Sequence, residues 1–384
     1  MLSRCEGKGS RRLPSSAIHG ESRAVGKPTI LGLVQVIDKG LLFPMTMPSS
    51  MTVAVTGATG FVGRYIVREL AGRGHTVRVL VRDVAKAREV FGAALSKLEV
   101  VVGDACDRVA LGKLTSRADA CIHLVGIIRE VRGESADLAQ TFQRMHIGAT
   151  HAVVDACRGS RVKRYVHMSA LGVGPDARAE YQRTKWEAER YVRRGFGDGT
   201  DLDWTIFRPG VIHGPDGEFI QLMHDLCTGD IPPFFFLPYF ARKRLDESVP
   251  AGRVDWVAPK VQPIAVEDVA FSFVEAISRP ETVGEIYNLV GPDVLSWPEM
   301  LEFLRDTLPG TKKGLVPFHI PGEHAAIMAT VAKTLGIGRL LPFDRGQALM
   351  GMEDSTAELN KVGADLGLRP RKFRETVRNY AARV

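Results

Sequence analysis

The stretch 52–64 constrains the fold of this chain more than any other part of the sequence. Residues 52–56 form a short apolar, β-branched run, which predicts a buried strand. Three glycines follow at a spacing of three, Gly57, Gly60 and Gly63, and a helical pattern begins behind them. Strand, glycine turn and helix in this order are typical of the first unit of a dinucleotide-binding fold.

Each glycine has a physical role in such a unit. Gly57 permits a tight turn, Gly60 lets backbone N–H groups approach a pyrophosphate, and Gly63 lets the helix pack close to the strand. The free N–H groups and the positive dipole end of the helix then attract the phosphates. The residues expected to contact the dinucleotide here are Gly57, Thr59, Gly60, Phe61, Val62, Gly63 and Arg64.

Apolar runs and helical patterns alternate along the next part of the chain. We expect further strands at 76–81, 98–102, 120–125, 165–168 and 204–208, and helices that include 140–157 and 181–194. This alternation predicts a parallel sheet with helices on both faces. The expected fold class is α/β, a Rossmann-like doubly wound parallel sheet with a smaller C-terminal α/β lobe. Ligands should then bind at the carboxyl ends of the strands.

The sequence divides into three parts. Residues 1–50 are rich in Ser, Gly, Arg and Pro without a sustained period, which indicates a disordered tail or an extension upstream of the true start. Residues 51–210 should form the NAD(P)-binding domain, and residues 211–384 the smaller lobe that faces a substrate or partner. Within that lobe, the apolar and then basic stretch 234–244 either touches a membrane surface or partner, or is simply a strand or lid.

Composition excludes several classes of function. Of the formal charge of +7, residues 1–50 contribute +4, and the rest contains no dense basic stripe, so we expect no nucleic-acid role. The five cysteines show no metal-ligand spacing, so we expect no metal site and a reducing compartment. No apolar run reaches the ~18 residues of a membrane span. The expected location is cytoplasmic, with a peripheral position at the membrane as the alternative.

The second motif is Tyr181 with Lys185 in the sequence YQRTK. Residues four apart on a helix share one face. An ammonium near the phenol favours the phenolate and would lower the pKa of Tyr181 toward the range useful for proton transfer. Tyr181 is therefore a candidate acid/base. Lys185 would support it and hydrogen-bond the nicotinamide ribose.

The end of the second strand predicts which dinucleotide is bound. An acidic residue there would bind the ribose 2′-OH of NAD, whereas an arginine accommodates the 2′-phosphate of NADP. Arg82 occupies this strand end, and Arg64 follows the last glycine nearby. Asp83 is one step further and could turn inward instead. We therefore predict a preference for NADP(H) over NAD(H).

Several further stretches carry a resemblance to a known family. They are 56–64 (TGATGFVGR), 123–126 (HLVG), 167–171 (HMSAL), 181–187 (YQRTKWE), 208–212 (RPGVI), 262–270 (QPIAVEDVA) and 287–292 (YNLVGP). On these residues the chain resembles atypical short-chain dehydrogenase/reductases with an NAD-dependent epimerase/dehydratase-like domain. More narrowly, it is similar to the nucleotide-binding accessory subunits of respiratory complex I and their bacterial relatives.

The resemblance implies roles for individual residues. Asp104 would contact the adenine, Gly126 and Pro209 would lie beside the cofactor, and Tyr181 and Lys185 would sit at its nicotinamide end. Active members of the family usually place a Ser or Thr just after the fifth strand, where it polarises the substrate carbonyl. Ser169 ends that strand here, but the next three positions are Ala-Leu-Gly. Ser169 is either that catalytic hydroxyl or a serine bonded to backbone.

Three functions therefore stay open. The first is an accessory-subunit-like protein in which the dinucleotide mainly stabilises the fold, with a membrane respiratory complex as partner. The second is an active reductase, dehydrogenase or epimerase on a small molecule, such as a quinone- or isoprenoid-related compound. The third is a regulator that senses the state of the nucleotide.

Overall fold

A computed structural model provides the structure of the chain, and it describes residues 50–131, 139–194, 202–246, 253–337 and 341–384. The chain separates into two units, Met1–Met47 and Pro48–Val384, and the second is described below. The expected tail at residues 1–50 lies outside the described residues apart from its last position, so its character stays a prediction.

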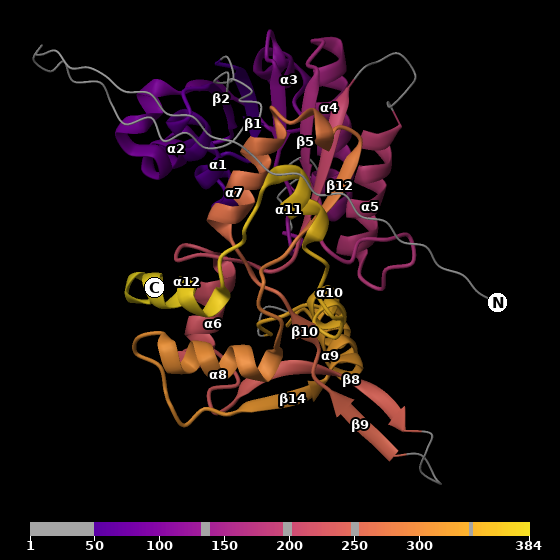
Figure 1. The fold of residues 1–384 in the computed structure, drawn as a ribbon. Helices are drawn as coiled ribbons and strands as arrows, with labels where there is room; N and C mark the ends of the chain where they lie inside the picture. Colours follow the sequence, from indigo (N-terminus) through magenta and orange to yellow (C-terminus); the bar gives the residue numbers. More distant parts are fainter. Residues whose placement is uncertain (1–49, 132–138, 195–201, 247–252, 338–340) are drawn as a thin grey trace, which may run out of the picture. The chain divides into compact units, whose positions relative to one another are not determined.

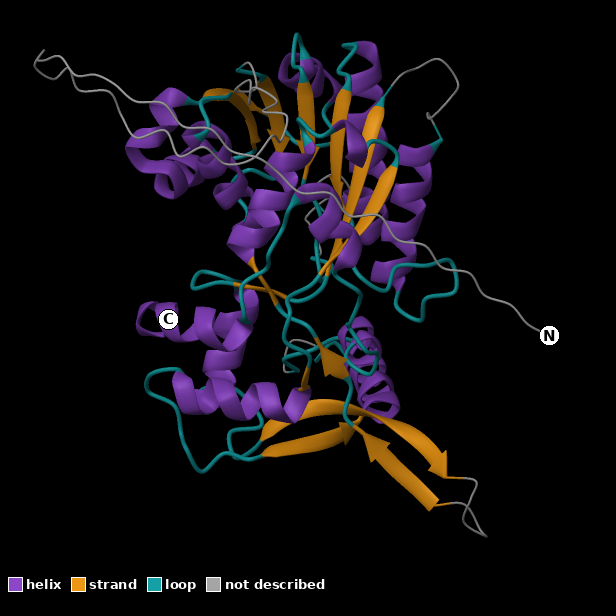
Figure 2. Ribbon diagram, viewed as in Figure 1, coloured by secondary structure: helices purple, strands orange, loops and turns teal. Residues whose placement is uncertain are grey.

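A seven-stranded parallel sheet forms the larger part of this unit (Figure 1), with the order β12-β6-β5-β4-β1-β2-β3. Its strands are β1 (Thr52–Thr56), β2 (Thr76–Val81), β3 (Glu99–Val102), β4 (Ala120–His123), β5 (Arg164–Met168), β6 (Asp203–Pro209) and β12 (Glu285–Leu289). Figure 2 shows helices on both sides of these strands. The expected Rossmann-like doubly wound fold is confirmed.

Alternating side chains of the strands build two apolar layers, because successive residues of a strand point to opposite faces. Val53 and Val55 of β1 pack in one layer, and Ala54 packs in the other. The first layer is covered by α1 (Phe61–Gly72), α2 (Val84–Phe91), α7 (Val266–Ala276) and α11 (Asn360–Leu366). The second is covered by α3 (Arg108–Thr115), α4 (Ala149–Gly159) and α5 (Glu180–Arg193).

The edge strand β12 comes from beyond the boundary expected at residue 210. It pairs with β6 from Glu285↔Thr205 to Leu289↔Pro209. Helices α7 and α11 return with it to the face that carries α1. The division into 51–210 and 211–384 therefore stays a prediction, and the structure adds that part of the second segment completes the sheet of the first.

The remaining elements form the expected smaller α/β lobe. Its three-stranded sheet has the order β14-β8-β9, from Pro317–Pro321, Leu237–Asp246 and Arg253–Val257. Two short pairs join β7 (Ile212–His213) to β11 (Ile264–Ala265) and β10 (Lys260–Val261) to β13 (Leu295–Ser296). The helices are α6 (Glu218–Thr228), α8 (Trp297–Thr307), α9 (Gly322–Thr334), α10 (Arg345–Met350) and α12 (Phe373–Tyr380). The stretch 234–244 thus leads into and forms most of strand β8.

Arg164 at the start of β5 links several elements near one edge of the large sheet through hydrogen bonds. Its buried guanidinium donates to the backbone carbonyls of Ala276 and Asp203 at 2.9 and 2.7 Å. It also donates to the hydroxyls of Thr205 and Thr282, both at 2.5 Å. Burial lowers the pKa of Arg164 to about 10, so the group stays charged at neutral pH. One side chain therefore joins β5, β6, α7 and the turn before β12.

We expect Arg164→Leu to lower the free energy of unfolding by about 3 kcal/mol, because buried acceptors would lose a charged donor. Denaturant unfolding of the two proteins measures this difference. Lys163→Leu is the matched control, since the neighbouring Lys163 is exposed and its side chain has no hydrogen bond or ion pair to the described residues. Equal losses for the two variants would contradict the role given to Arg164.

Candidate functional site

The turn between β1 and α1 has the geometry of a phosphate-binding loop. Gly57 has a φ angle of +72°, which residues with a Cβ rarely adopt. The Gly60 N–H donates to the Gly57 carbonyl at 3.0 Å. Gly60 is also the N-cap of α1 and has no side chain to accept from the first N–H groups of the helix. Those N–H groups can therefore bind an anion.

Gly63 sets the distance between α1 and the turn. A Cβ at Gly63 would lie only 2.2 Å from the Gly57 carbonyl oxygen, so no other residue fits without moving the helix. Thr59 and Phe61 are half-buried in and after the turn. Val62 is buried in the core beneath it, so only its backbone can face a ligand.

The two arginines expected near the 2′-phosphate have different surroundings. Arg64 donates to the Asp216 carbonyl at 2.9 Å and is therefore already engaged. Arg82, after β2, is exposed and has no hydrogen bond or ion pair with any residue that the structure describes. The neighbouring Asp83 caps α2, and its carboxylate accepts from the Ala85 N–H at 2.7 Å. Asp83 thus faces its own helix, whereas Arg82 is a charged group at this strand end without a partner among the described residues.

Asp104, which follows β3, makes contacts that the sequence did not predict. One of its carboxylate oxygens accepts from the Cys106 N–H and from the Arg144 guanidinium, each at 2.9 Å. Arg144 belongs to a π-helical turn, Gln143–Gly148, that leads into α4. The sequence predicted ordinary helix over 140–157, because the side-chain pattern of one π turn is too short to detect. Such turns are frequent at functional sites.

Tyr181 and Lys185 lie one turn apart on α5, as expected, but the pKa of Tyr181 differs from expectation. The Lys185 ammonium donates to the Met168 carbonyl at 2.9 Å, and burial lowers the pKa of Lys185 to about 8. Burial raises the pKa of Tyr181 to about 12. The predicted lowering of the phenol pKa is therefore wrong in direction, because burial disfavours the charged form of the phenol. A Cβ at Gly126 would lie 2.7 Å from the Lys185 Nζ, so Gly126 lies directly beside this group.

Ser169 and Pro209 end the neighbouring strands β5 and β6. The Ser169 N–H donates to the Phe207 carbonyl at 2.7 Å, which continues the sheet. Its hydroxyl oxygen is buried and has no hydrogen-bond partner among the described residues. Such a group is costly unless a ligand supplies the partner. Pro209 is buried at the end of β6, and its carbonyl accepts from the Leu171 N–H at 2.9 Å.

Three buried histidines surround Lys185, and the sequence analysis did not single them out. The ring of His146 is linked to the Thr184 hydroxyl at 2.8 Å, and the rings of His123 and His167 stack at 5.5 Å. Burial, and then the Lys185 charge, lowers the pKa of His123 to about 3 and that of His146 to about 2. The histidines are therefore neutral at physiological pH. Only the fold reveals them, because they come from three separate elements.

A second set of contacts links α5 to the smaller lobe. The Gln182 side chain, next to Tyr181, donates to the Glu353 carboxylate at 3.0 Å. Arg129, in the loop after β4, donates to the Gln347 side chain of α10 at 3.1 Å. No sequence pattern marks these pairs, because their members lie far apart in the chain. They hold the region around α10 against the end of the site that contains Tyr181.

The glycine loop, the strand ends and α5 together fit a nicotinamide dinucleotide. The loop offers phosphate-binding N–H groups where a Cβ would fill the space, and Ser169 offers an unpaired hydroxyl near Lys185. Among the residues that the structure describes, no group of three His, Cys, Asp or Glu side chains could hold a metal ion. Within the same residues, no helix is long and apolar enough to cross a membrane.

The fold and this site define a dinucleotide-binding Rossmann protein. A family model described as NAD(P)H-binding matches residues 57–226. The ceramide reductase of Caulobacter vibrioides is 30% identical over 272 residues, which are 70% of this chain and 74% of that protein. The chain therefore belongs to the atypical short-chain dehydrogenase/reductases and binds a nicotinamide dinucleotide.

Other relatives extend this assignment. The mitochondrial NADH dehydrogenase (ubiquinone) 1 alpha subcomplex subunit 9 of Dictyostelium discoideum is 25% identical over 264 residues, which are 68% of this chain. The chain spans 65% of the length of that relative. The structure of UDP-glucose 4-epimerase from Thermotoga maritima shares the fold, with a TM-score of 0.61 and 16% identity. That match covers 87% of this chain and 98% of the epimerase.

We expect Gly60→Val to abolish dinucleotide binding, because the added side chain would occupy the space where the loop meets the pyrophosphate. Titration with NADPH, together with a melting curve to check folding, measures the effect. Gly72→Val is the matched control, since a Cβ at Gly72, the last residue of α1, has no neighbour within 4 Å. Wild-type NADPH affinity in a folded Gly60→Val protein would contradict the assignment of the loop.

Proposed function

We propose that the protein binds NADP(H) and holds it without turnover, as an accessory-type component of a membrane respiratory complex at the periphery of the membrane. The observation that carries this proposal is the hydrogen bond from the Lys185 ammonium to the Met168 carbonyl at 2.9 Å, which engages the ammonium with backbone rather than with the Tyr181 phenol. General acid–base catalysis is most efficient when the pKa of the catalytic group lies near the operating pH. The pKa of Tyr181 is about 12, far above that range.

The surroundings of Lys185 support the same conclusion. Its ammonium donates a hydrogen bond to the Met168 carbonyl, and its side chain lies directly beside Gly126. In this position Lys185 can hold a ribose hydroxyl of the cofactor, but it does little to activate the phenol. The relatives named as subunits of mitochondrial NADH dehydrogenase are consistent with an accessory role. A ligand held in this way stabilises the folded protein by mass action.

A second candidate function is supported by Ser169 and by the relative named ceramide reductase. In this alternative the protein reduces a carbonyl of an apolar small molecule, such as a quinone- or isoprenoid-related compound. Bound NADPH would supply the hydride to the carbonyl carbon. The unpaired Ser169 hydroxyl would donate a hydrogen bond to the carbonyl oxygen, and the neutral Tyr181 would transfer its proton to that oxygen. Lys185 would orient the ribose.

The preference for NADP(H) over NAD(H) is part of the proposal. Arg82 supports it, because this exposed guanidinium has no partner among the described residues and can form two parallel hydrogen bonds with a phosphate. Asp83, which could have bound the 2′-OH of NAD, is engaged as the cap of α2.

We expect Arg82→Ala to weaken NADPH binding by at least about tenfold, since a charged hydrogen bond contributes about 1.5–3 kcal/mol, and to change NADH binding little. Parallel titrations with the two nucleotides measure this. Arg88→Ala on the exposed side of α2 is the matched control for loss of a positive charge. Equal affinity of the wild type for NADH and NADPH would refute the preference.

The role of Tyr181 separates the two candidate functions. For an accessory-type protein we expect no cofactor oxidation by the wild type, an unchanged melting temperature of the NADPH complex in Tyr181→Phe, and a lower one in Lys185→Ala. For a reductase, Tyr181→Phe would lose about 10²–10⁴-fold in rate at unchanged NADPH affinity. NADPH oxidation with quinones and long-chain ketones, measured beside melting curves, gives the answer. Robust wild-type turnover that Tyr181→Phe eliminates would replace the first proposal with the second.

A further inference from the structure

Gln182 of α5, next to Tyr181, carries a buried polar atom that has no partner in the fold. The residue is only 4% exposed. Its amide nitrogen donates to the Glu353 carboxylate at 3.0 Å, whereas its amide oxygen is buried without a hydrogen-bond partner among the described residues. A carboxylate can only accept, so the amide must turn its N–H to Glu353 and present its oxygen elsewhere. A buried acceptor in this state is costly unless a ligand supplies the donor.

The Gln182 amide lies at the turn that follows β5. A Cβ at Gly172, which has a φ angle of +77°, would lie 2.8 Å from the Gln182 Nε2 and 3.9 Å from a Glu353 carboxylate oxygen. Ser169, three residues earlier, is 2% exposed, and its hydroxyl is the second unpaired polar group at this turn. Three residues span at most about 10 Å, so one small molecule can reach both groups. Gly172 is exposed, so a shift of this turn gives the ligand access.

Glu353 comes from the smaller lobe, where the backbone holds it in a fixed position. The carboxylate of the next residue, Asp354, accepts from the Lys260 N–H at 2.8 Å, and the Ser355 N–H donates to the Lys260 carbonyl at 2.8 Å. A Cβ at Gly210, just after β6, would lie 3.4 Å from the Ser355 hydroxyl. The segment 353–355 therefore passes the carboxyl edge of the large sheet, which is where open α/β sheets bind their ligands.

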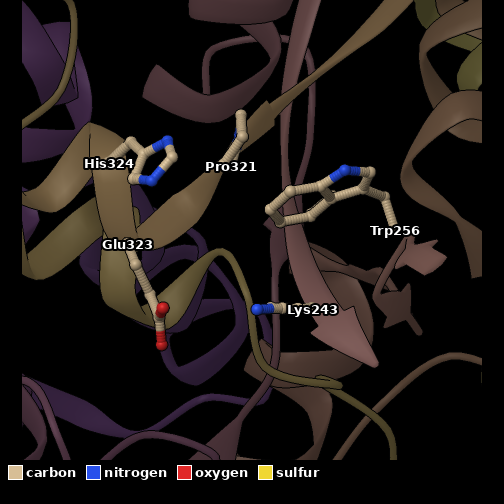
Figure 3. A pocket seen from close by; sticks show the side chains of 6 residues that line it. Lys243, Trp256, Pro321, Glu323 and His324 are labelled. Atoms are coloured by element: carbon tan, nitrogen blue, oxygen red, sulfur yellow. The ribbon is translucent and has the colours of Figure 1, made fainter. Parts of the chain in front are cut away.

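A cavity between β8, β9 and α9 of the smaller lobe differs from this place. Figure 3 shows the cavity, of about 230 Å³, with Lys243 and Trp256 on one side and Glu323 on the other. The Glu323 carboxylate is paired with Arg178 at 3.4 Å, whereas Glu353 has no ion pair with a described residue. None of the six side chains that line the cavity, all of them described, has a buried polar atom without a partner. The cavity therefore shows no requirement for a polar ligand.

We propose that Gln182, Glu353 and Ser169 form a subsite beside the dinucleotide for a small carbonyl compound that also carries a hydroxyl or an amide N–H. This donor would bind the Gln182 oxygen, and Glu353 would hold the amide in the required orientation. The Ser169 hydroxyl would donate to the carbonyl. A quinone offers acceptors only and would leave the Gln182 oxygen unpaired, so the subsite disfavours it. The inference rests on the dinucleotide site of the proposed function, but not on whether the cofactor is turned over.

Calorimetric titration of the full chain, saturated with NADP⁺ so that no ketone is reduced, tests this subsite. The probes are octan-2-one, 1-hydroxyoctan-2-one and 4-hydroxyoctan-2-one, which share the carbonyl and differ in the donor. We expect the wild type to bind a hydroxy ketone at least about fivefold more tightly than octan-2-one, which is the effect of one net hydrogen bond. In Gln182→Met, which keeps the length of the side chain but has no amide oxygen, this preference should disappear while octan-2-one binds as before.

Glu353 is tested as a positioning residue. Glu353→Leu should reduce the preference, because the amide could then turn. Glu353→Gln should restore it, since the glutamine oxygen can accept from the same N–H. An unchanged preference in Glu353→Leu, with only a lower melting temperature, would show a merely structural role and contradict the positioning.

Two variants serve as matched controls. Gln221→Met removes an exposed glutamine of α6 that also donates to a carboxylate, that of Asp225 at 2.9 Å. Glu323→Leu removes the carboxylate of the neighbouring cavity, which is exposed and contacts Arg178. Both should keep the wild-type preference, and melting curves check that each variant folds.

Equal affinity of the wild type for the three ketones, binding of none of them, or an unchanged preference in folded Gln182→Met would overturn the subsite. The Gln182 oxygen would then be satisfied by water alone. NADP⁺ titration of the same samples separates this outcome from a failure of the dinucleotide site, because normal NADP⁺ binding would leave the proposed function unaffected.

Discussion

The close contact between α1 and the turn after β1 is the constraint on which the rest of the structure depends. With no side chain at Gly63, the helix comes near enough to the Gly57 carbonyl to aim its first N–H groups at the carboxyl edge of the sheet. The same contact fixes α1 against β1, and α7 then packs beside α1 in one apolar layer. Phosphate binding and core packing therefore rely on the same backbone geometry, and a change at this turn affects both.

Local pattern was sufficient for six of the seven strands of the sheet. Strands β1, β2, β5 and β6 are buried on both faces, so each is a nearly continuous apolar run that the sequence displays directly. The return of Glu285–Leu289 to the sheet could not be predicted, because a strand's partner depends on the path of the whole chain. The role of Asp83 also required the structure, since capping of α2 depends on where its side chain turns.

The chemistry of the site was less predictable than its location. Spacing alone placed Tyr181 and Lys185 on one face of α5, which the structure bears out. Their pKa values depend on burial, and burial depends on three histidines and on Met168, which come from elements far apart in the chain. No motif shows, either, that the Ser169 hydroxyl is buried without a hydrogen-bond partner among the described residues. A motif therefore identifies which groups are present, while the surrounding layers decide whether they transfer protons.

Side-chain contacts from the C-terminal part of the chain link the smaller lobe to the cofactor domain. Arg371, just before α12 of the smaller lobe, binds the buried Asp268 of α7 on the sheet, and Gln182 of α5 donates to Glu353, just after α10, at 3.0 Å. The chain thus passes between lobe and sheet several times. The smaller lobe and the cofactor domain are therefore joined by packed elements rather than by one linker. Because these contacts include Gln182, next to Tyr181, a shift of the smaller lobe would also change the surroundings of Tyr181.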